Sequence, residues 1–302
     1  MVLGITRGDW RRLRTGVLFA SPWIIGFLAF TVFPIVASFY YSLHVYTTLG
    51  QPMRWVGFEN FRQLLFEDEL FWTSLYNTIF MVGLGVPFHI LLAVILALFL
   101  NLRLHGVAFY RTIYYLPTIV PVVATSVLWM WVFNPEYGLI NAFLGIAGIH
   151  GPGWLTDPTL AKPALILMGC WMIGGTIIIF LAGLQDIPES LIEAAMLDGA
   201  SALQRVWHVT LPLLSPVILF NLVMGVIGNF QVFTQAFIMT QGGPLDATLF
   251  YALYLYRNAF EYFKMPYASA IAWLLFVVVL GATLLIFRSS SRFVYYEGEE
   301  HR

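Results

Sequence analysis

Long uninterrupted apolar runs dominate the pattern of hydrophobic and polar positions along this chain. Six of them lie at 17–42, 76–100, 112–133, 163–185, 213–235 and 267–287. Each exceeds the roughly 20 residues that a helix needs to cross the apolar core of a bilayer. Strands of a membrane barrel would be about half as long and would alternate polar with apolar residues, which these runs do not. The pattern therefore predicts an all-α polytopic membrane protein, with one transmembrane domain over residues 1–302.

The composition agrees with this prediction. Hydrophobic residues make up 60% of the chain and charged residues only 10%, whereas a soluble domain carries about a quarter charged residues. The formal net charge of -1 gives no attraction for nucleic acid, so we expect no contact with it. The apolar composition leads us to expect contact with membrane lipid. Cys170 is the single cysteine, which excludes an internal disulfide.

The distribution of basic residues predicts the orientation in the membrane, because Lys and Arg favour the cytoplasmic side. The first run follows a basic segment, but it is too long for the apolar part of a signal peptide, so we expect a retained span. One side of the predicted topology carries ten basic residues, namely Arg7, Arg11, Arg12, Arg14, Arg103, Arg111, Arg205, Arg288, Arg292 and Arg302. The other side carries five, namely Arg54, Arg62, Lys162, Arg257 and Lys264. We therefore expect both termini to be cytoplasmic.

The six runs contain no Asp, Glu, Lys or Arg, and His89 alone among their side chains titrates near neutral pH. Proton-coupled transporters place ionisable residues inside the membrane, so their absence argues against that class, although a sodium-coupled carrier stays open. We interpret His89 as a helix-interface residue bonded to a neighbour. The chain has no phosphate-binding Gly-Lys motif and no H-E-x-x-H motif. We expect no catalytic residue, no metal and no cofactor in this chain.

Prolines and paired glycines interrupt the runs. They are Pro34, Pro87, Pro117, Pro121 and Pro216, together with Gly174-Gly175. Membrane helices tolerate such residues when neighbouring groups satisfy the freed carbonyls. The pattern predicts kinks, and both packing and flexure during transport remain possible reasons for them.

The loop at 186–212, between the fourth and fifth runs, has clear helix signals. Ser190 and Glu193 have the spacing of a capping box at the start of a short helix. Gly199 follows Asp198, where a left-handed residue would end that helix. Ser201 is the expected cap of a second short helix, from about Ala202 to Val209, which we expect to end at Pro212. These signals suit a docking element and a simple connector equally well.

The same loop resembles the EAA loop of permease subunits of ABC importers. The residues that match are Glu193, Ala194, Ala195, Asp198, Gly199, Ala200, Leu211 and Pro212, and Val206 stands where the family often has Phe. The resemblance extends over nearly the whole chain, through VGFENFRQLL at 56–65, YRTIYYLPTIVP at 110–121, WMWVFNPEYGLIN at 129–141, FLAGLQDIPESLIEAA at 180–195 and TQGGP at 240–244. It points to the carbohydrate-type permeases, in the first-subunit branch. Pro266, in MPYASA at 265–270, departs from the Gly that this family pattern leads us to expect.

The resemblance implies a type I ABC importer permease fold and a multi-pass protein of a prokaryotic cytoplasmic membrane. It implies that the loop forms a coupling helix that docks in a cleft of an ATPase subunit. The implied partners are a second permease subunit in a heterodimer, two ATP-binding subunits that bind ATP and Mg, and an extracytoplasmic solute-binding protein. The implied cargo is a sugar or oligosaccharide, with glycerol phosphate also possible, and the uncharged spans favour a neutral sugar.

Candidate contacts with the cargo lie in the fourth and fifth runs. Asn221, Gly225 and Asn229 are spaced four apart and share one helical face, and Asn229 lies near a position that lines the sugar site in similar permeases. Trp171, Gly174 and Gly175 offer a stacking face and space. The alternative is that these residues only pack helices together. Gly242, Gly243 and Pro244 are candidates for contact with the binding protein, or for a simple turn.

A stand-alone secondary transporter is the leading alternative, and a membrane-embedded enzyme is a third. The former would show inverted repeats and the latter a buried acid, base or metal cluster. The sequence contains no convincing instance of either.

Overall fold

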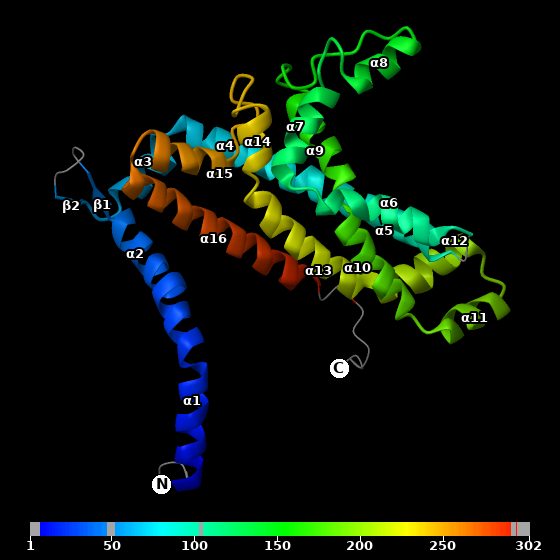
Figure 1. Cartoon of the computed structure of the whole chain (residues 1–302), viewed down its shortest axis with the longest axis horizontal. Coiled ribbons are helices and arrows are strands. Elements are labelled where there is room, and N and C mark those ends of the chain that lie inside the picture. Colours follow the sequence, from blue (N-terminus) through cyan, green and yellow to red (C-terminus); the bar gives the residue numbers. More distant parts are fainter. Residues whose placement is uncertain (1–6, 47–51, 103–104, 291–293, 295–302) are drawn as a thin grey trace. The chain divides into compact units, whose positions relative to one another are not determined.

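The computed structural model is mostly helical (Figure 1) and describes residues 7–46, 52–102, 105–290 and 294. Arg103, Arg292 and Arg302, which count toward the predicted orientation, lie outside the described residues. Contacts divide the chain into two compact units. One contains the residues up to Glu67 with Arg257–Leu274, and the other contains Asp68–Tyr256 with the residues from Leu275 onward.

The first unit starts with α1 (Arg7–Phe27) and α2 (Phe33–Ser42), which a π-helical turn at Leu28–Val32 joins. A two-stranded antiparallel ribbon follows, in which β1 (His44–Val45) pairs with β2 (Arg54–Trp55), and then α3 (Glu59–Phe66). Asn60 fastens α3 to this segment, because its amide nitrogen lies 2.7 Å from the carbonyl oxygens of both Ser42 and His44.

The second unit is a helical bundle. Its helices are α4 (Glu69–Phe80), α5 (Val86–Asn101), α6 (Val107–Ile119), α7 (Val122–Val132), α8 (Leu139–Ile146), α9 (Ala161–Trp171), α10 (Gly174–Gln185), α11 (Glu189–Leu197), α12 (Ala202–Arg205), α13 (Leu211–Phe230), α14 (Thr234–Met239) and α15 (Tyr251–Tyr256). Buried side chains of α5, α10 and α13 form its core, among them Ala97, Phe180 and Leu214. The last helix, α16 (Met265–Ser290), starts in the first unit and ends in the second. Pro266 lies in its first turn, where a proline costs no hydrogen bond.

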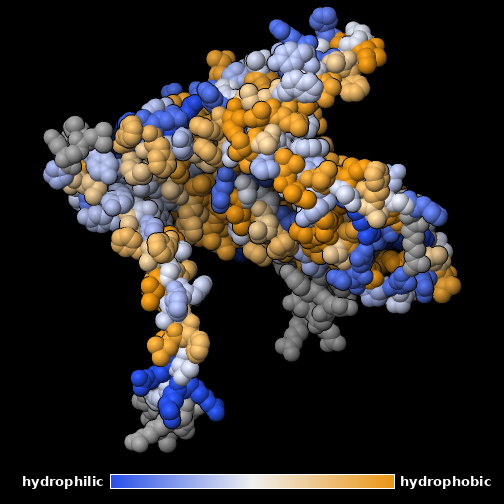
Figure 2. All heavy atoms as spheres, viewed as in Figure 1, coloured by the Kyte–Doolittle hydropathy of each residue, from blue (hydrophilic) through white to orange (hydrophobic). Residues whose placement is uncertain are grey.

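Among the described residues, four helices are long and apolar enough to cross a membrane, and they run over Trp10–Ser42, Glu69–Asn101, Ala202–Met239 and Met265–Ser290. Two further spans are bent pairs, with α6 and α7 at 103° and α9 and α10 at 52°. The third and fourth predicted runs are therefore not straight helices. Many large apolar side chains are exposed along the helices, and hydrophobic residues cover much of the face of the molecule that Figure 2 shows.

The bends lie where the prolines and glycines predict them. Val120, before Pro121, is extended with φ −72° and ψ 128°, because the proline ring disfavours a helical residue in front of it. The second bend lies at Met172 and Ile173, directly before the glycine pair.

Three other prolines are accommodated without a bend of this kind. Pro34, Pro87 and Pro212 each follow a π-helical turn, at Leu28–Val32, Met81–Gly85 and Val206–Thr210. A proline ring clashes with the carbonyl four residues earlier, and in each case that carbonyl belongs to the middle of the wider turn. The prediction that a helix ends at Pro212 is therefore wrong. The helix passes through it from Ala202 to Met239.

Candidate functional site

The loop at residues 186–212, called the EAA loop here for its resemblance, consists of α11, a turn, α12, the π-helical turn Val206–Thr210 and the start of α13 (Figure 1). The predicted capping box at Ser190 and Glu193 is wrong. Pro188 is the N-cap of α11, with φ −58° and no side-chain cap. Proline presets this backbone angle, so the helix starts at Glu189 and Ser190 already lies inside it.

A capping box does form at the start of α12. The Gln204 amide donates to the Ser201 hydroxyl, with 3.4 Å between nitrogen and oxygen, and the Ser201 amide donates to Gln204 Oε1 at 2.8 Å. Ser201 is thus the cap that the sequence predicts. Ser201 and Gln204 also have the spacing of a capping box, so the sequence alone could have placed the box here rather than at Ser190.

Gly199 ends α11 as predicted. Its φ is +81°, a left-handed conformation that glycine adopts without steric cost. The amide of Gly199 donates to the Met196 carbonyl at 3.0 Å, and the amide of Ala200 donates to the Ala195 carbonyl at 2.9 Å. This pair of bonds is a Schellman motif, which satisfies the last carbonyls of the helix.

The predicted coupling residues lie at the surface. None of the nine residues of α11, all of which the structure describes, is buried. Glu193, Ala194, Asp198, Gly199 and Pro212 are exposed, whereas Ala195 and Ala200 are half-buried. Leu197 is 90% exposed, which leaves a large apolar side chain free for a partner.

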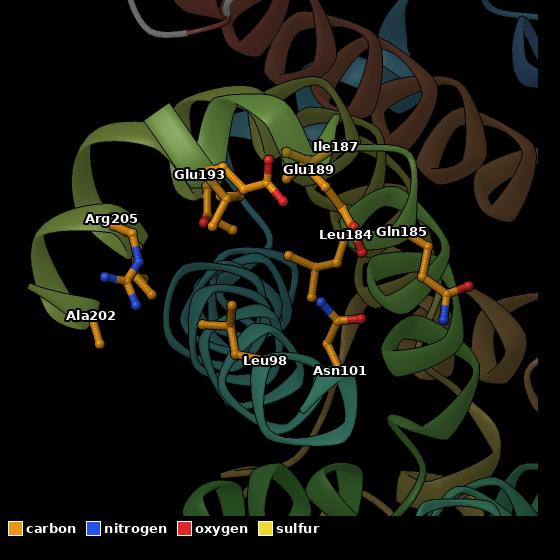
Figure 3. A pocket seen from close by; sticks show the side chains of 12 residues that line it. Leu98, Asn101, Leu184, Gln185, Ile187, Glu189, Glu193, Ala202 and Arg205 are labelled. Carbon is orange, nitrogen blue, oxygen red and sulfur yellow. The ribbon is translucent and has the colours of Figure 1, made fainter. Parts of the chain in front are cut away.

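A cavity of about 570 Å³ lies behind α11. Its walls come from α5, α10, α11 and α12, and Figure 3 shows among them Leu98, Asn101, Leu184, Gln185, Glu189, Glu193, Ala202 and Arg205. Val206 also lines it, at the position where the family pattern often has the larger Phe. Arg205 donates to the Ala200 carbonyl at 2.7 Å, so α12 is fastened to the end of α11 across the turn.

The candidate cargo residues of α13 use their amides within their own helix. Asn221 donates to the Val217 carbonyl at 2.8 Å, and Asn229 donates to the Gly225 carbonyl at 3.0 Å. Asn221 is buried and Asn229 is half-buried. A Cβ on Gly225 would lie 2.9 Å from Val86 Cγ1, so this glycine lets α13 approach α5 closely.

The other candidates flank the bend between α9 and α10. Trp171 packs edge-on against Trp129, with 6.2 Å between ring centroids. A Cβ on Gly174 would lie 2.1 Å from the Tyr114 carbonyl oxygen, so α6 fills the space beside this glycine. Gly175 has open space beside it. Contact between any of these residues and a cargo molecule stays a prediction.

His89 is a helix-interface residue, as predicted. Its Nε2 lies 2.8 Å from the carbonyl oxygen of Ile166 in α9, so this nitrogen carries the proton and donates it. Its ring covers Gly169, where a Cβ would lie 2.4 Å from it. In the part of the chain that the structure describes, no three His, Cys, Asp or Glu residues are grouped to hold a metal ion.

The GGP loop, residues 240–250, contains the turn that the sequence predicts. Gly242 has φ +81°, and the peptide between Gly243 and Pro244 is cis. Leu245 is 89% exposed, whereas Thr248, Leu249, Phe250 and Tyr251 are buried. Burial raises the pKa of the Tyr251 phenol, which therefore stays neutral.

A polar network that sequence reasoning missed joins this loop to Asn77 in α4 and Lys162 in α9. Its partners are far apart along the chain, and an Asn and a Lys near the ends of two apolar runs were its only local signals.

A family model for the "Binding-protein-dependent transport system inner membrane component" matches residues 69–292. The chain belongs to this family. The match covers both the EAA loop and the GGP loop, and it confirms the predicted permease of a binding-protein-dependent importer.

Relatives of this permease match it over nearly their full lengths. It is 46% identical over 289 residues to "Probable ABC transporter permease protein YesP" of Bacillus subtilis, covering 94% of this chain and 93% of that protein. It is 34% identical over 280 residues to "Trehalose/maltose transport system permease protein MalF" of Thermococcus litoralis, covering 91% and 93% of the two chains.

Solved structures confirm the fold. A chain of the bacterial alginate ABC transporter, in complex with an alginate pentasaccharide-bound periplasmic protein, superposes with a TM-score of 0.83 at 26% identity. The match covers 94% of this chain and 96% of that one. The type I importer permease fold is therefore the fold of this chain, and a stand-alone secondary transporter finds no support among these relatives.

Proposed function

We propose that this permease forms half of the translocation path of an importer for sugars or oligosaccharides, together with a second permease subunit. Two ATP-binding subunits, which bind ATP and Mg, would drive it, and an extracytoplasmic binding protein would deliver the cargo. The names of relatives for trehalose and maltose, and the periplasmic protein in the alginate transporter complex, support these assignments.

The proposed docking to an ATPase subunit is supported chiefly by the exposure of α11. It is a helix with a fixed end at Gly199, an exposed small-residue face and an exposed Leu197, and none of its nine described residues is buried. A surface helix normally buries one face, so α11 has the properties of an element that completes its packing on another protein. Docking of this helix on a cytoplasmic ATPase would agree with the distribution of basic residues, which favours a cytoplasmic side for the EAA loop and both termini.

The central experiment is reconstitution in liposomes of this chain with its second permease, ATPase subunits and binding protein. We expect uptake of a labelled oligosaccharide that needs both ATP inside and the loaded binding protein outside. A panel of neutral sugars, acidic oligosaccharides and glycerol phosphate would identify the cargo. Uptake by this chain alone, driven by an ion gradient, would refute the proposal.

The purified chain alone should hydrolyse no ATP above background, since its sequence contains no Gly-Lys dipeptide and so no phosphate-binding loop of that kind. The measurement is phosphate release by the isolated chain and by the assembled complex. Robust hydrolysis by the isolated chain would contradict the role of a passive subunit.

A further inference from the structure

Asn77 uses its whole side-chain amide to join three segments of the second unit. Its amide nitrogen donates to the carbonyl oxygens of Asp246, at 2.7 Å, and Leu249, at 3.2 Å. Its Oδ1 accepts from Lys162 Nζ at 2.9 Å. The side chain is only 2% exposed. One residue of α4 thus holds both the GGP loop and the first turn of α9.

The arrangement permits a single orientation of the amide. Two carbonyls can only accept, and an ammonium group can only donate. Rotating the amide by half a turn would place its oxygen against two carbonyl oxygens and its nitrogen against the ammonium group. Lys162 is itself held between two rings, with Nζ 5.1 Å from the centroid of Tyr76 and 4.8 Å from that of Phe80, a geometry that stabilises a cation.

Thr78 of α4 and Asp68, the N-cap of α4, hold the chain just beyond the loop. Thr78 Oγ1 accepts from the Tyr251 amide at 2.9 Å. Asp68 caps α4 by accepting from the Phe71 amide at 3.0 Å and also accepts from the Tyr254 hydroxyl. The segment 246–254 is therefore fastened along α4 at several points.

Hydrogen bonds also join Gly242 and Gly243 of the GGP loop to this fastened segment. The Thr248 hydroxyl donates to the Gly243 carbonyl at 2.7 Å, and the Thr248 amide donates to the Gly242 carbonyl at 3.1 Å. Leu245 and Asp246, which lie between Gly243 and Thr248, have φ of 48° and 57°. This region is strained for residues other than glycine, which keep it only when their surroundings require it.

Asn77 acts at this strained point, because it binds the carbonyl of Asp246 itself. Without that bond, the left-handed pair would relax, and the exposed Leu245 and the half-buried Pro244 would lose their fixed positions. We propose that Asn77, supported by Lys162, is the positioning residue that holds the GGP loop in the conformation that docks the solute-binding protein. The inference rests on the proposed function, which provides that partner.

The decisive variant is Asn77→Asp, which keeps the shape but replaces both donors with an acceptor facing two carbonyls. In the assembled complex, we expect the concentration of loaded binding protein that gives half-maximal ATPase activity to rise about tenfold, while the maximal rate changes less than threefold. Lys162→Met keeps the packing against Tyr76 and Phe80 but removes the donor, and should raise the half-saturating concentration about threefold.

The matched control is Thr73→Val, one turn before Asn77 on α4. The Thr73 hydroxyl bonds the Glu69 carbonyl of its own helix, so this variant should stay within about twofold of the wild type. A rise equal to that of Asn77→Asp would show that any polar loss on α4 has this effect, and would overturn the positioning role.

Amide hydrogen exchange of residues 242–250 gives a second readout in the same complexes. We expect faster exchange in both test variants and unchanged exchange in the control. The inference would be overturned by unchanged exchange in Asn77→Asp, or by faster exchange with an unchanged half-saturating concentration of binding protein. Uptake by the wild-type complex would leave the proposed function intact in either case. A wild-type complex whose ATPase activity ignores the binding protein would instead refute the proposed function, and the docking role with it.

Discussion

The EAA loop and the GGP loop lie at opposite ends of one helical run, Ala202–Met239, and are built in contrasting ways. The GGP loop is packed, with Thr248, Leu249 and Phe250 at 0–1% exposure, and Asn77 of α4 fastens it through two hydrogen bonds. In the EAA loop, none of the nine described residues of α11 is buried, and a cavity of about 570 Å³ lies behind the helix. Elements with few buried contacts open most easily.

The two loops obtain their order from different sources. The chain itself holds the GGP loop in position, so a partner that docks there meets a preformed surface, which lowers the entropic cost of binding. The EAA loop is ordered chiefly by short-range bonds, namely the Schellman motif at Gly199, the capping box at Ser201 and the Arg205 contact with Ala200. We infer that α11 gains its remaining order from the ATPase.

The largest expected effect comes from Gly199→Val, which acts at the end of α11, a helix in which no residue is buried. A β-branched residue at φ +81° would cost roughly 1–2 kcal/mol. An added Cβ would meet no atom of the chain within 4 Å, so the strain would change the helix end without disturbing the bundle. We expect the six spans to insert normally while ATPase recovered on co-purification falls about tenfold, with substrate-stimulated hydrolysis lost.

Gly199→Asn is the matched control, because Asn tolerates the left-handed region far better than Val. It should retain most of the bound ATPase. If Gly199→Val also retains ATPase and stimulated hydrolysis at normal levels, the EAA loop is only a connector and the contrast between the loops has no functional meaning.

A paired test uses the two leucines that the loops expose, Leu197 at 90% and Leu245 at 89%. Burying a leucine in an interface contributes roughly 1.5–3 kcal/mol, although part of this is offset by ordering. We expect Leu197→Ser to weaken ATPase binding about fivefold without changing the response to the binding protein. Leu245→Ser should have the converse effect. Each variant is the control for the other, and equal effects of both on one partner would break the assignment of the loops.

Local signals predicted much of this structure. The six apolar runs, the bends at Pro121 and at the glycine pair, the left-handed Gly199 and the cap at Ser201 all depend on residues within a few positions of one another. The errors also have local causes. Pro188 took the cap position that Ser190 was expected to fill, and a π-helical turn carried the helix through Pro212.

The network at Asn77 was beyond such signals. Asn77 and the carbonyl of Asp246 are 169 residues apart in the sequence, and each looks unremarkable in its own surroundings. Only the packing of α4, α9 and the GGP loop brings them together. The cavity behind α11 is a similar case, because it arises from space left between four helices rather than from any one sequence pattern.

The last effect concerns Asn229, within the helical run that joins the two loops. Its amide already donates to the Gly225 carbonyl, so a cargo molecule could use only the oxygen and the second N–H. Losing one such hydrogen bond costs on the order of 1 kcal/mol, or about fivefold in the concentration of sugar required. In Asn229→Leu we therefore expect uptake at limiting sugar to fall about fivefold, while assembly, ATPase binding and the response to the binding protein stay near normal, since leucine suits a helix and leaves both loops untouched.

Asn221→Leu, two turns earlier, serves as the comparison. It removes a buried amide that makes the same kind of intrahelical bond as Asn229. A specific loss at Asn229 would separate cargo contact from helix packing, whereas equal losses in both variants, or unchanged uptake in Asn229→Leu, would return Asn229 to a packing role.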